Sequence, residues 1–175
     1  MLTVIAVIRY SLWVLTAVLG VSVSADETVL LDDCHSSSGW LFEKGAEFPG
    51  AAGSLGVESK RLALKYDFSG GGTYVAAVYA GLFPAQAETL KLKISSASES
   101  KFSLRVTDSA GRVFQSQELS VGAKDSVFSL DLKNQKWASA WGGTDKTAKQ
   151  PEAPVKKLWI CANKSSSEKS GVIYI

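Results

Sequence analysis

Two tryptophans lie in the longest stretch of the chain without a regular pattern, residues 134–153, which is rich in Lys, Gln, Gly and Pro. Trp137 and Trp141 bracket Ala-Ser-Ala and precede Gly142-Gly143. A loop aromatic backed by glycines can present its flat π-face to an apolar C–H surface, such as that of a sugar ring. The same rings could instead fold over a hydrophobic core as a lid, and the sequence leaves both roles open.

Residues for nucleophilic or acid–base catalysis are sparse. The only histidine, His35, lies in a Cys-His-Ser-Ser-Ser segment without a nucleophile-elbow pattern, so we expect it at the surface. Gly70-Gly71-Gly72 is followed by Thr-Tyr and not by Gly-Lys-Ser/Thr, which predicts a turn and not a phosphate-binding loop. Asp32-Asp33, Asp125 and Asp131 supply carboxylates for glycoside hydrolysis, but the sequence does not locate a catalytic pair among them. We expect no enzymatic activity.

Metal ligands are equally few. The chain has no Cys-x-x-Cys or His-x-x-x-His motif, which argues against zinc. Asp26, Asp32 and Asp33 cluster near the first predicted strand of the domain, and oxygen ligands of this kind suit calcium. A structural Ca²⁺ site at Asp32 and Asp33 is therefore one interpretation, and ordinary acidic residues beside a strand are the other.

The two cysteines, Cys34 and Cys161, lie near opposite ends of the domain. In an exported protein they can form one disulfide bridge. Such a bridge would close a loop long enough to stabilise the fold by on the order of 5 kcal/mol in the chain-entropy model. The alternative is two buried free thiols that behave as small apolar residues.

The first 25 residues have the composition of a signal peptide. A mostly apolar run, Leu12–Leu19, leads to the small residues Val23-Ser24-Ala25, which is typical of a signal-peptidase site. Arg9 and the polar residues after it keep the apolar run shorter than the roughly 18 residues expected of a transmembrane helix. We predict cleavage after Ala25, which leaves one secreted domain, residues 26–175, in an extracellular or periplasmic location.

The charge balance points to no polyanionic partner. The sequence has 19 Lys and Arg against 17 Asp and Glu, and loss of Arg9 with the signal peptide would bring the net charge to about +1. The charges are interspersed along the chain, so neither nucleic acid nor a lipid surface is indicated.

Apolar residues alternate with polar ones over most of the domain. In residues 61–68, Leu62, Leu64 and Tyr66 share one side, as in a half-buried strand. The same alternation predicts strands at residues 28–31, 73–79, 90–94, 102–106, 113–117, 127–132, 158–162 and 171–175. Trp159 lies within one of these strands, and we expect it to pack against a sheet face.

Turn signals separate the predicted strands. The most specific is Asp108–Gly111, where Gly111 can supply the positive φ that closes a hairpin between two alternating strands. Short strands with regular turns predict an all-β fold, an antiparallel β-sandwich.

Several segments together resemble the galactose-binding-domain-like jelly-roll modules, which are carbohydrate-binding modules attached to secreted bacterial glycoside hydrolases. The resemblance covers most of residues 26–175. It is carried by Leu31–Asp33, Asp67–Val75, Val106–Gln115, Trp141–Asp145 and Ser170–Ile175. In that family the last strand runs into an acidic pair that helps to hold calcium, whereas this sequence ends at Ile175, as a shortened reading frame or a module cut from a longer protein would.

The resemblance implies a jelly roll of about eight to ten strands that binds a polysaccharide or glycan without catalysis and is appended to a glycoside hydrolase domain. Its loop signature maps onto Trp141, Gly142, Gly143 and Asp145. Trp137, a candidate ligand-binding residue because it is a loop aromatic, is not part of that signature. Arg105, Gln115 and Gln117 are expected to point outward and could add hydrogen bonds to a ligand.

Two alternatives remain at this stage, a module that binds a protein partner and a purely architectural domain of a larger secreted enzyme. A partner-binding module should expose an apolar patch of several hundred Å² on one sheet face. An architectural domain should bury its aromatic residues and have no lined groove. Exposure of Trp137 and Trp141 beside Asp145 would favour a sugar ligand.

Overall fold

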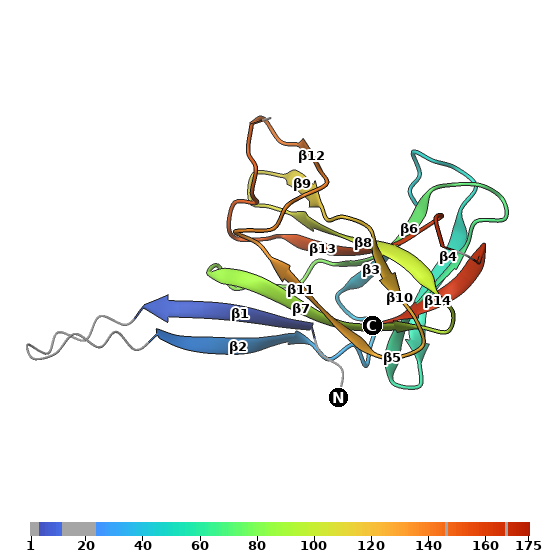
Figure 1. Cartoon of the computed structure of the whole chain (residues 1–175), viewed down its shortest axis with the longest axis horizontal. Coiled ribbons are helices and arrows are strands. Elements are labelled where there is room, and N and C mark those ends of the chain that lie inside the picture. Colours follow the sequence, from blue (N-terminus) through green and yellow to red (C-terminus); the bar gives the residue numbers. More distant parts are fainter. Residues whose placement is uncertain (1–3, 12–23, 146, 167) are drawn as a thin grey trace, which may run out of the picture.

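The computed structural model describes residues 4–11, 24–145, 147–166 and 168–175, with side chains described from Glu27 onward. Within these residues every regular element is a β-strand, and the strands form two stacked sheets (Figure 1). None of the described residues belongs to a helix that could cross a membrane. The all-β antiparallel sandwich predicted from the sequence is confirmed.

The first sheet, which we call sheet A, has seven strands. β7 (Ala87–Ser96) pairs with three strands, β1 (Val4–Ser11), β14 (Ser170–Tyr174) and β11 (Ser126–Asp131). The order across the sheet is β2 (Ser24–Asp32), β1, β7, β14, β5 (Arg61–Asp67) and β4 (Ala52–Glu58).

The second sheet, sheet B, also has seven strands, and it carries the residues discussed below. Its order is β12 (Ser139–Gly142), β9 (Arg112–Gln115), β8 (Ser100–Thr107), β13 (Lys157–Asn163), β6 (Tyr74–Tyr79) and β3 (Trp40–Glu43), with β10 (Leu119–Val121) also paired to β8. All of its pairings are antiparallel, so alternate residues of each strand point to opposite faces.

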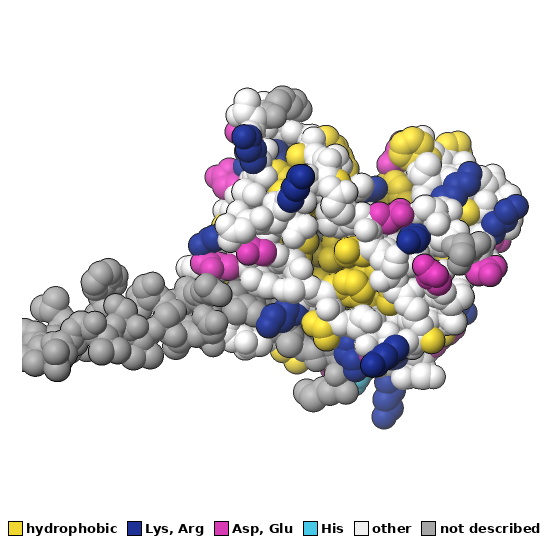
Figure 2. Space-filling model, in the orientation of Figure 1, with side chains coloured by type: hydrophobic (Ala, Val, Ile, Leu, Met, Phe, Trp, Pro, Cys, Tyr) yellow, Lys and Arg dark blue, Asp and Glu magenta, His cyan; other side chains and the backbone are white. Residues whose placement is uncertain are grey.

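The hydrophobic core lies between the two sheets. Leu62 and Leu64 of β5 and Leu104 of β8 are fully buried in it. Phe102 meets Phe128 edge to face, with ring centroids 4.9 Å apart. Each such side chain contributes about 1.5–3 kcal/mol by leaving water, which explains why the period of two is so clear in the sequence. Figure 2 shows hydrophobic side chains between β10 and β11 in the middle of the visible face.

Every strand predicted from the sequence is present, although β9 ends at Gln115 and not at Gln117. The hairpin between β8 and β9 is also confirmed, because Gly111 has a φ of 76° and the Asp108 amide donates to the Arg112 carbonyl over 2.9 Å. The strands that the sequence did not predict are β1, β3, β4, β10 and β12. Of these, β12 lies inside the segment that was predicted to be irregular.

The predicted signal peptide, residues 1–25, falls partly on residues outside the described ranges. The described part includes β1, which lies between β2 and β7 in sheet A. Cleavage after Ala25 stays a prediction, and it would remove β1 from the sheet.

The disulfide between Cys34 and Cys161 is not formed, and this corrects one of the two sequence-based interpretations. Both thiols are free and buried. Cys34 belongs to the core between the sheets, whereas Cys161 packs with Tyr74, Ala76 and Val78 in a separate cluster on the opposite side of sheet B. The sheet itself therefore separates the two side chains.

We expect both cysteines to react with thiol reagents only after unfolding. Burial raises the pKa of the Cys34 thiol to about 12 and that of the Cys161 thiol to about 11, so little thiolate forms at neutral pH. Mass spectrometry after alkylation without reductant should find two labels per chain in denaturant and none in the native protein over the same time. Labelling that requires a reductant even in denaturant would instead show a bridge.

Candidate functional site

The face of sheet B that points away from the core is lined by aromatic and polar side chains. Tyr74, Ala76, Val78 and Cys161 form a buried cluster there, and Trp159 packs against its edge. Such a cluster outside the main core means that larger side chains cover the middle of this face. The most important of them is Arg105 of β8, which is paired across the strands with Trp159.

A cleft of about 300 Å³ crosses the strands on this face, and we call it the aromatic cleft. It reaches from β12 at one edge of the sheet to β3 at the other. Its walls are made by two tryptophans, a tyrosine, an arginine and two carboxylates, together with small residues of the β3–β4 loop. The lining residues are Glu43, Gly45, Ala46, Glu47, Tyr74, Arg105, Val113, Trp141 and Trp159.

Arg105 and Tyr74 form the floor of the aromatic cleft at its centre. The Arg105 guanidinium lies 4.1 Å from the centroid of the Tyr74 ring and 5.4 Å from that of Trp141. Its Nε donates to Oε1 of Gln115 over 2.7 Å. Cation–π contact on two rings and a side-chain hydrogen bond hold the guanidinium in one orientation.

The acidic side of the aromatic cleft is fixed in a similar way. The Tyr74 hydroxyl donates to Oε1 of Glu47 over 2.7 Å. This hydrogen bond lowers the pKa of Glu47, while burial, with the Glu47 carboxylate as a second cause, raises the pKa of Tyr74. Glu47 is therefore ionised and Tyr74 neutral at neutral pH, so one tyrosine has a carboxylate acceptor at its hydroxyl group and a guanidinium donor over its ring.

A second cleft, of about 370 Å³, adjoins the first, and we call it the polar cleft. It shares Tyr74 and Arg105 with the aromatic cleft, so these two side chains divide the face of the sheet. The lining residues are Phe48, Thr73, Tyr74, Arg105, Gln115, Glu118, Asn163, Lys164 and Ser165.

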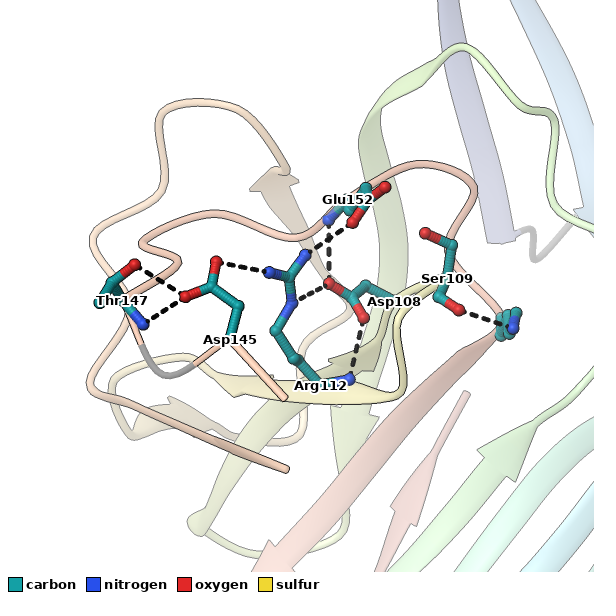
Figure 3. A network of polar contacts seen from close by, with 7 residues as sticks. Asp108, Ser109, Arg112, Asp145, Thr147 and Glu152 are labelled. Atoms are coloured by element: carbon teal, nitrogen blue, oxygen red, sulfur yellow. Dashed lines mark hydrogen bonds and ion pairs between the residues drawn. The ribbon is translucent and has the colours of Figure 1, made fainter. Parts of the chain in front are cut away.

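The segment that carries Trp141 is held in place by a buried ion pair. Asp108 is fully buried in the β8–β9 hairpin, and its Oδ2 accepts from Nε of Arg112 over 2.7 Å (Figure 3). The same guanidinium reaches Asp145 over 3.3 Å and Glu152 over 3.0 Å. One arginine thus ties both ends of the segment 145–152 to the hairpin.

The carboxylate of Asp108 is charged because its hydrogen bonds outweigh its burial. Burial alone raises its pKa, but the backbone amides of Glu152 and Arg112 and the Arg112 guanidinium all donate to it and bring the pKa below the ordinary range. The ion pair is therefore present throughout the neutral pH range.

The chain between Trp141 and Asp145 requires glycine. Gly142 and Gly143 have φ values of 76° and 58°. A Cβ at Gly143 would lie 2.4 Å from Cγ of Arg112, so a side chain there would push against the ion pair. The tight turn leaves Trp141 beside Val113 on the outer face, with 43% of its surface exposed.

The structure brings three of the six predicted ligand-binding residues together. Trp141 and Arg105 line the aromatic cleft, and Gln115 lies in the polar cleft and holds Arg105. Their contact with a ligand stays a prediction.

The other three predicted residues line neither of these two clefts. Trp137 packs on Phe114 with ring centroids 5.6 Å apart and donates to Oε1 of Gln150, which is the arrangement expected of a lid. Asp145 accepts hydrogen bonds from Thr147 and from Arg112, and it lines a separate small cavity of about 80 Å³ together with Trp141. Gln117 is exposed beyond the end of β9.

Tyr74, Glu43, Glu47 and Trp159 were not predicted as site residues. Trp159 was assigned to packing against a sheet face, and it does pack there, but it is half-buried and also lines the aromatic cleft. A usable signal was present, because Trp159 alternates with Leu158 and Ile160 and therefore had to face away from the core.

Asp32 and Asp33 each accept a backbone hydrogen bond in the turn after β2, from the amides of Cys34 and His35. Within the described ranges, no group of three or more His, Cys, Asp or Glu side chains has a metal-binding arrangement. A calcium site at Asp32 and Asp33 stays a prediction.

No family model matches this sequence, and no curated protein matches it. Solved structures do match the fold. A family 11 carbohydrate-binding module from Clostridium thermocellum, in complex with a beta-1,3-1,4-mixed-linked tetrasaccharide, is 12% identical over 82% of this chain and 89% of its own, with a TM-score of 0.56. The family 11 module of a cellulosomal cellulase from Clostridium thermocellum is 11% identical over 78% and 83%, with a TM-score of 0.53.

An agarase is 10% identical, with a TM-score of 0.50, over 78% of this chain but only 23% of its own length. In that enzyme the shared fold is thus one part of a much longer chain. These matches confirm the jelly-roll β-sandwich and, at the level of the fold, the resemblance to carbohydrate-binding modules.

We expect Asp108→Asn to destabilise the fold by about 3 kcal/mol at neutral pH, because the Arg112 charge would then lack its buried partner. Since the pKa of Asp108 is lowered by folding, its contribution is complete above the ordinary carboxyl pKa and is lost as the pH falls through the lowered value. Urea unfolding measured from pH 7 downward should therefore show that the difference in unfolding free energy between wild type and variant becomes smaller below about pH 4. A difference in unfolding free energy that stays the same at every pH would contradict this account. Asp33→Asn, at an exposed carboxylate, is the control.

Proposed function

We propose that the chain is a non-catalytic carbohydrate-binding module of a secreted protein and that its glycan lies in the aromatic cleft on sheet B. The observation that carries the proposal is the open cleft in which Trp141 and Trp159 flank the stacked pair of Arg105 and Tyr74. Such a cleft combines flat apolar rings with charged hydrogen-bonding groups in one place.

A sugar ring needs this combination of groups. Its axial C–H bonds form an apolar face that can stack on an indole ring, and its hydroxyl groups project from the edge. Carboxylates such as Glu43 and Glu47 accept hydrogen bonds from hydroxyl groups, and Arg105 donates to hydroxyl or ring oxygens. Hydrogen bonds to charged groups are the stronger ones, so these residues can offset the loss of sugar hydration.

The site is also pre-organised. Arg105 is held by two rings and by Gln115, and Glu47 is held by Tyr74, before any ligand arrives. Ordering a flexible side chain on binding costs about 0.5–1.5 kcal/mol, and these residues have already lost most of that freedom.

The fold is consistent with the proposal, and the site carries it, because one fold can host many functions. The family 11 module that matches over most of its length binds a mixed-linked tetrasaccharide, and a match to part of an agarase is consistent with a module appended to a glycoside hydrolase. A purely architectural domain would bury its aromatics and lack a lined groove, whereas Trp141 is 43% exposed beside a cleft.

We expect Trp141→Ala to weaken glycan binding by about tenfold or more, as truncation of a central aromatic commonly does. Calorimetry and tryptophan fluorescence against soluble polysaccharides, including mixed-linked beta-glucan and agar oligosaccharides, measure the effect. Trp159→Ala should act in the same direction.

Trp137→Phe is the matched control, because its ring packs on Phe114 outside the cleft and a phenyl ring preserves that packing. Its affinity should equal that of the wild type. A well-folded wild type that binds no glycan would overturn the proposal in favour of an architectural role.

A further inference from the structure

The polar cleft differs from the aromatic cleft in its charge. The aromatic cleft contains two carboxylates, Glu43 and Glu47, against the single cation Arg105. The polar cleft contains two cations, Arg105 and Lys164, against one carboxylate, Glu118. The two clefts therefore have opposite charge balance although they share a wall.

The hydrogen-bonding groups of the polar cleft are mainly donors. The side-chain carbonyl oxygen of Gln115 accepts a hydrogen bond from Nε of Arg105, so the side-chain N–H groups of Gln115 are what it can offer to a ligand. The Arg105 guanidinium has further N–H donors besides Nε. Lys164 is exposed, and its backbone amide donates to the Thr73 carbonyl, which fixes its position at the rim.

The one carboxylate in the polar cleft is already engaged. Oε2 of Glu118 accepts from Nδ2 of Asn163 over 3.1 Å and from the Ser165 hydroxyl. Asn163 in turn accepts from the Ser103 hydroxyl over 3.4 Å. These bonds engage the acceptor atoms of Glu118 and Asn163. The cations of the cleft, Arg105 and Lys164, are therefore suited to a ligand that is rich in hydrogen-bond acceptors.

We infer that the polar cleft is a second binding surface and that it selects a sugar unit carrying a carboxylate or sulfate group. The inference rests on the proposed function, because the anionic unit would belong to the glycan whose neighbouring unit occupies the aromatic cleft. Arg105 then contacts both sugar units, and Lys164 and Gln115 bind the anionic group. A guanidinium binds carboxylate or sulfate oxygens through two parallel hydrogen bonds, which makes it suited to this role.

The overall charge of the protein does not attract polyanions, since 19 basic residues face 17 acidic ones. A preference for an anionic glycan would therefore be a property of the polar cleft and not of the whole surface.

The test compares matched pairs of polysaccharides by calorimetry. Polygalacturonate is paired with its fully methyl-esterified form, and a sulfated carrageenan with its desulfated form. We expect the charged member of at least one pair to bind about tenfold tighter, and the pair in which this happens identifies carboxylate or sulfate. The ratio of the two affinities should decrease as the salt concentration is raised, because salt screens interactions between exposed charges.

Variants separate the two clefts. Lys164→Glu and Gln115→Ala should reduce the preference for the charged member, whereas Trp141→Ala should weaken both members of a pair by a similar factor. Lys91→Ala removes an exposed cation from the opposite sheet and should leave the affinity for both members of each pair unchanged.

Equal binding of both members of each pair, or a preference that survives Lys164→Glu, would overturn this inference and leave the proposed function intact. An effect of Lys91→Ala as large as that of Lys164→Glu would show general charge attraction and would also overturn it. Failure of the wild type to bind any charged or neutral glycan would overturn the proposed function as well.

Discussion

Asp108 accepts hydrogen bonds from the backbone and guanidinium of Arg112 inside the β8–β9 hairpin, and this buried pair holds together one end of sheet B. Burying two charges is costly, and the cost is offset only where every remaining hydrogen-bonding group is used. Here Arg112 extends to Asp145 and Glu152, so the pair also fixes the segment that follows β12. The position of Trp141 on the outer face depends on this network, although none of the four residues of the network lines the aromatic or the polar cleft.

The second organising contact is the stack of Arg105 on Tyr74. It covers a buried cluster that includes Cys161, and it separates two clefts whose hydrogen-bonding groups have opposite character. A flat sheet face would offer one uniform surface. A single long side chain laid across strands β8, β13 and β6 gives this face two chemically distinct halves, which is the basis for proposing that adjacent sugar units are read differently.

Burial explains how much could be predicted from the sequence. Leu62 and Leu64 must face the core, and that requirement imposes the alternation by which β5 was found. The edge strands β4 and β12 are mostly exposed, so no such requirement marked them. Alternation also directed Arg105 outward and set Trp159 on the opposite face of its strand from Leu158 and Ile160, but it carries no information about which neighbours these side chains meet. The β3–β4 loop, which brings Glu47 to Tyr74, has no periodic pattern, and its role could be seen only in three dimensions.

Strands β6, β8, β9 and β13 of sheet B each direct one set of side chains into the core and the alternate set toward the clefts. On β13, for example, Leu158 and Ile160 stabilise the fold while Trp159 and Asn163 face outward. The stability of the fold and the chemistry of the cleft surface are thus encoded at alternating positions of the same short segments. Evolution, or a protein engineer, can therefore exchange one outward residue per strand and change the chemistry of the clefts while the inward residues keep the same fold.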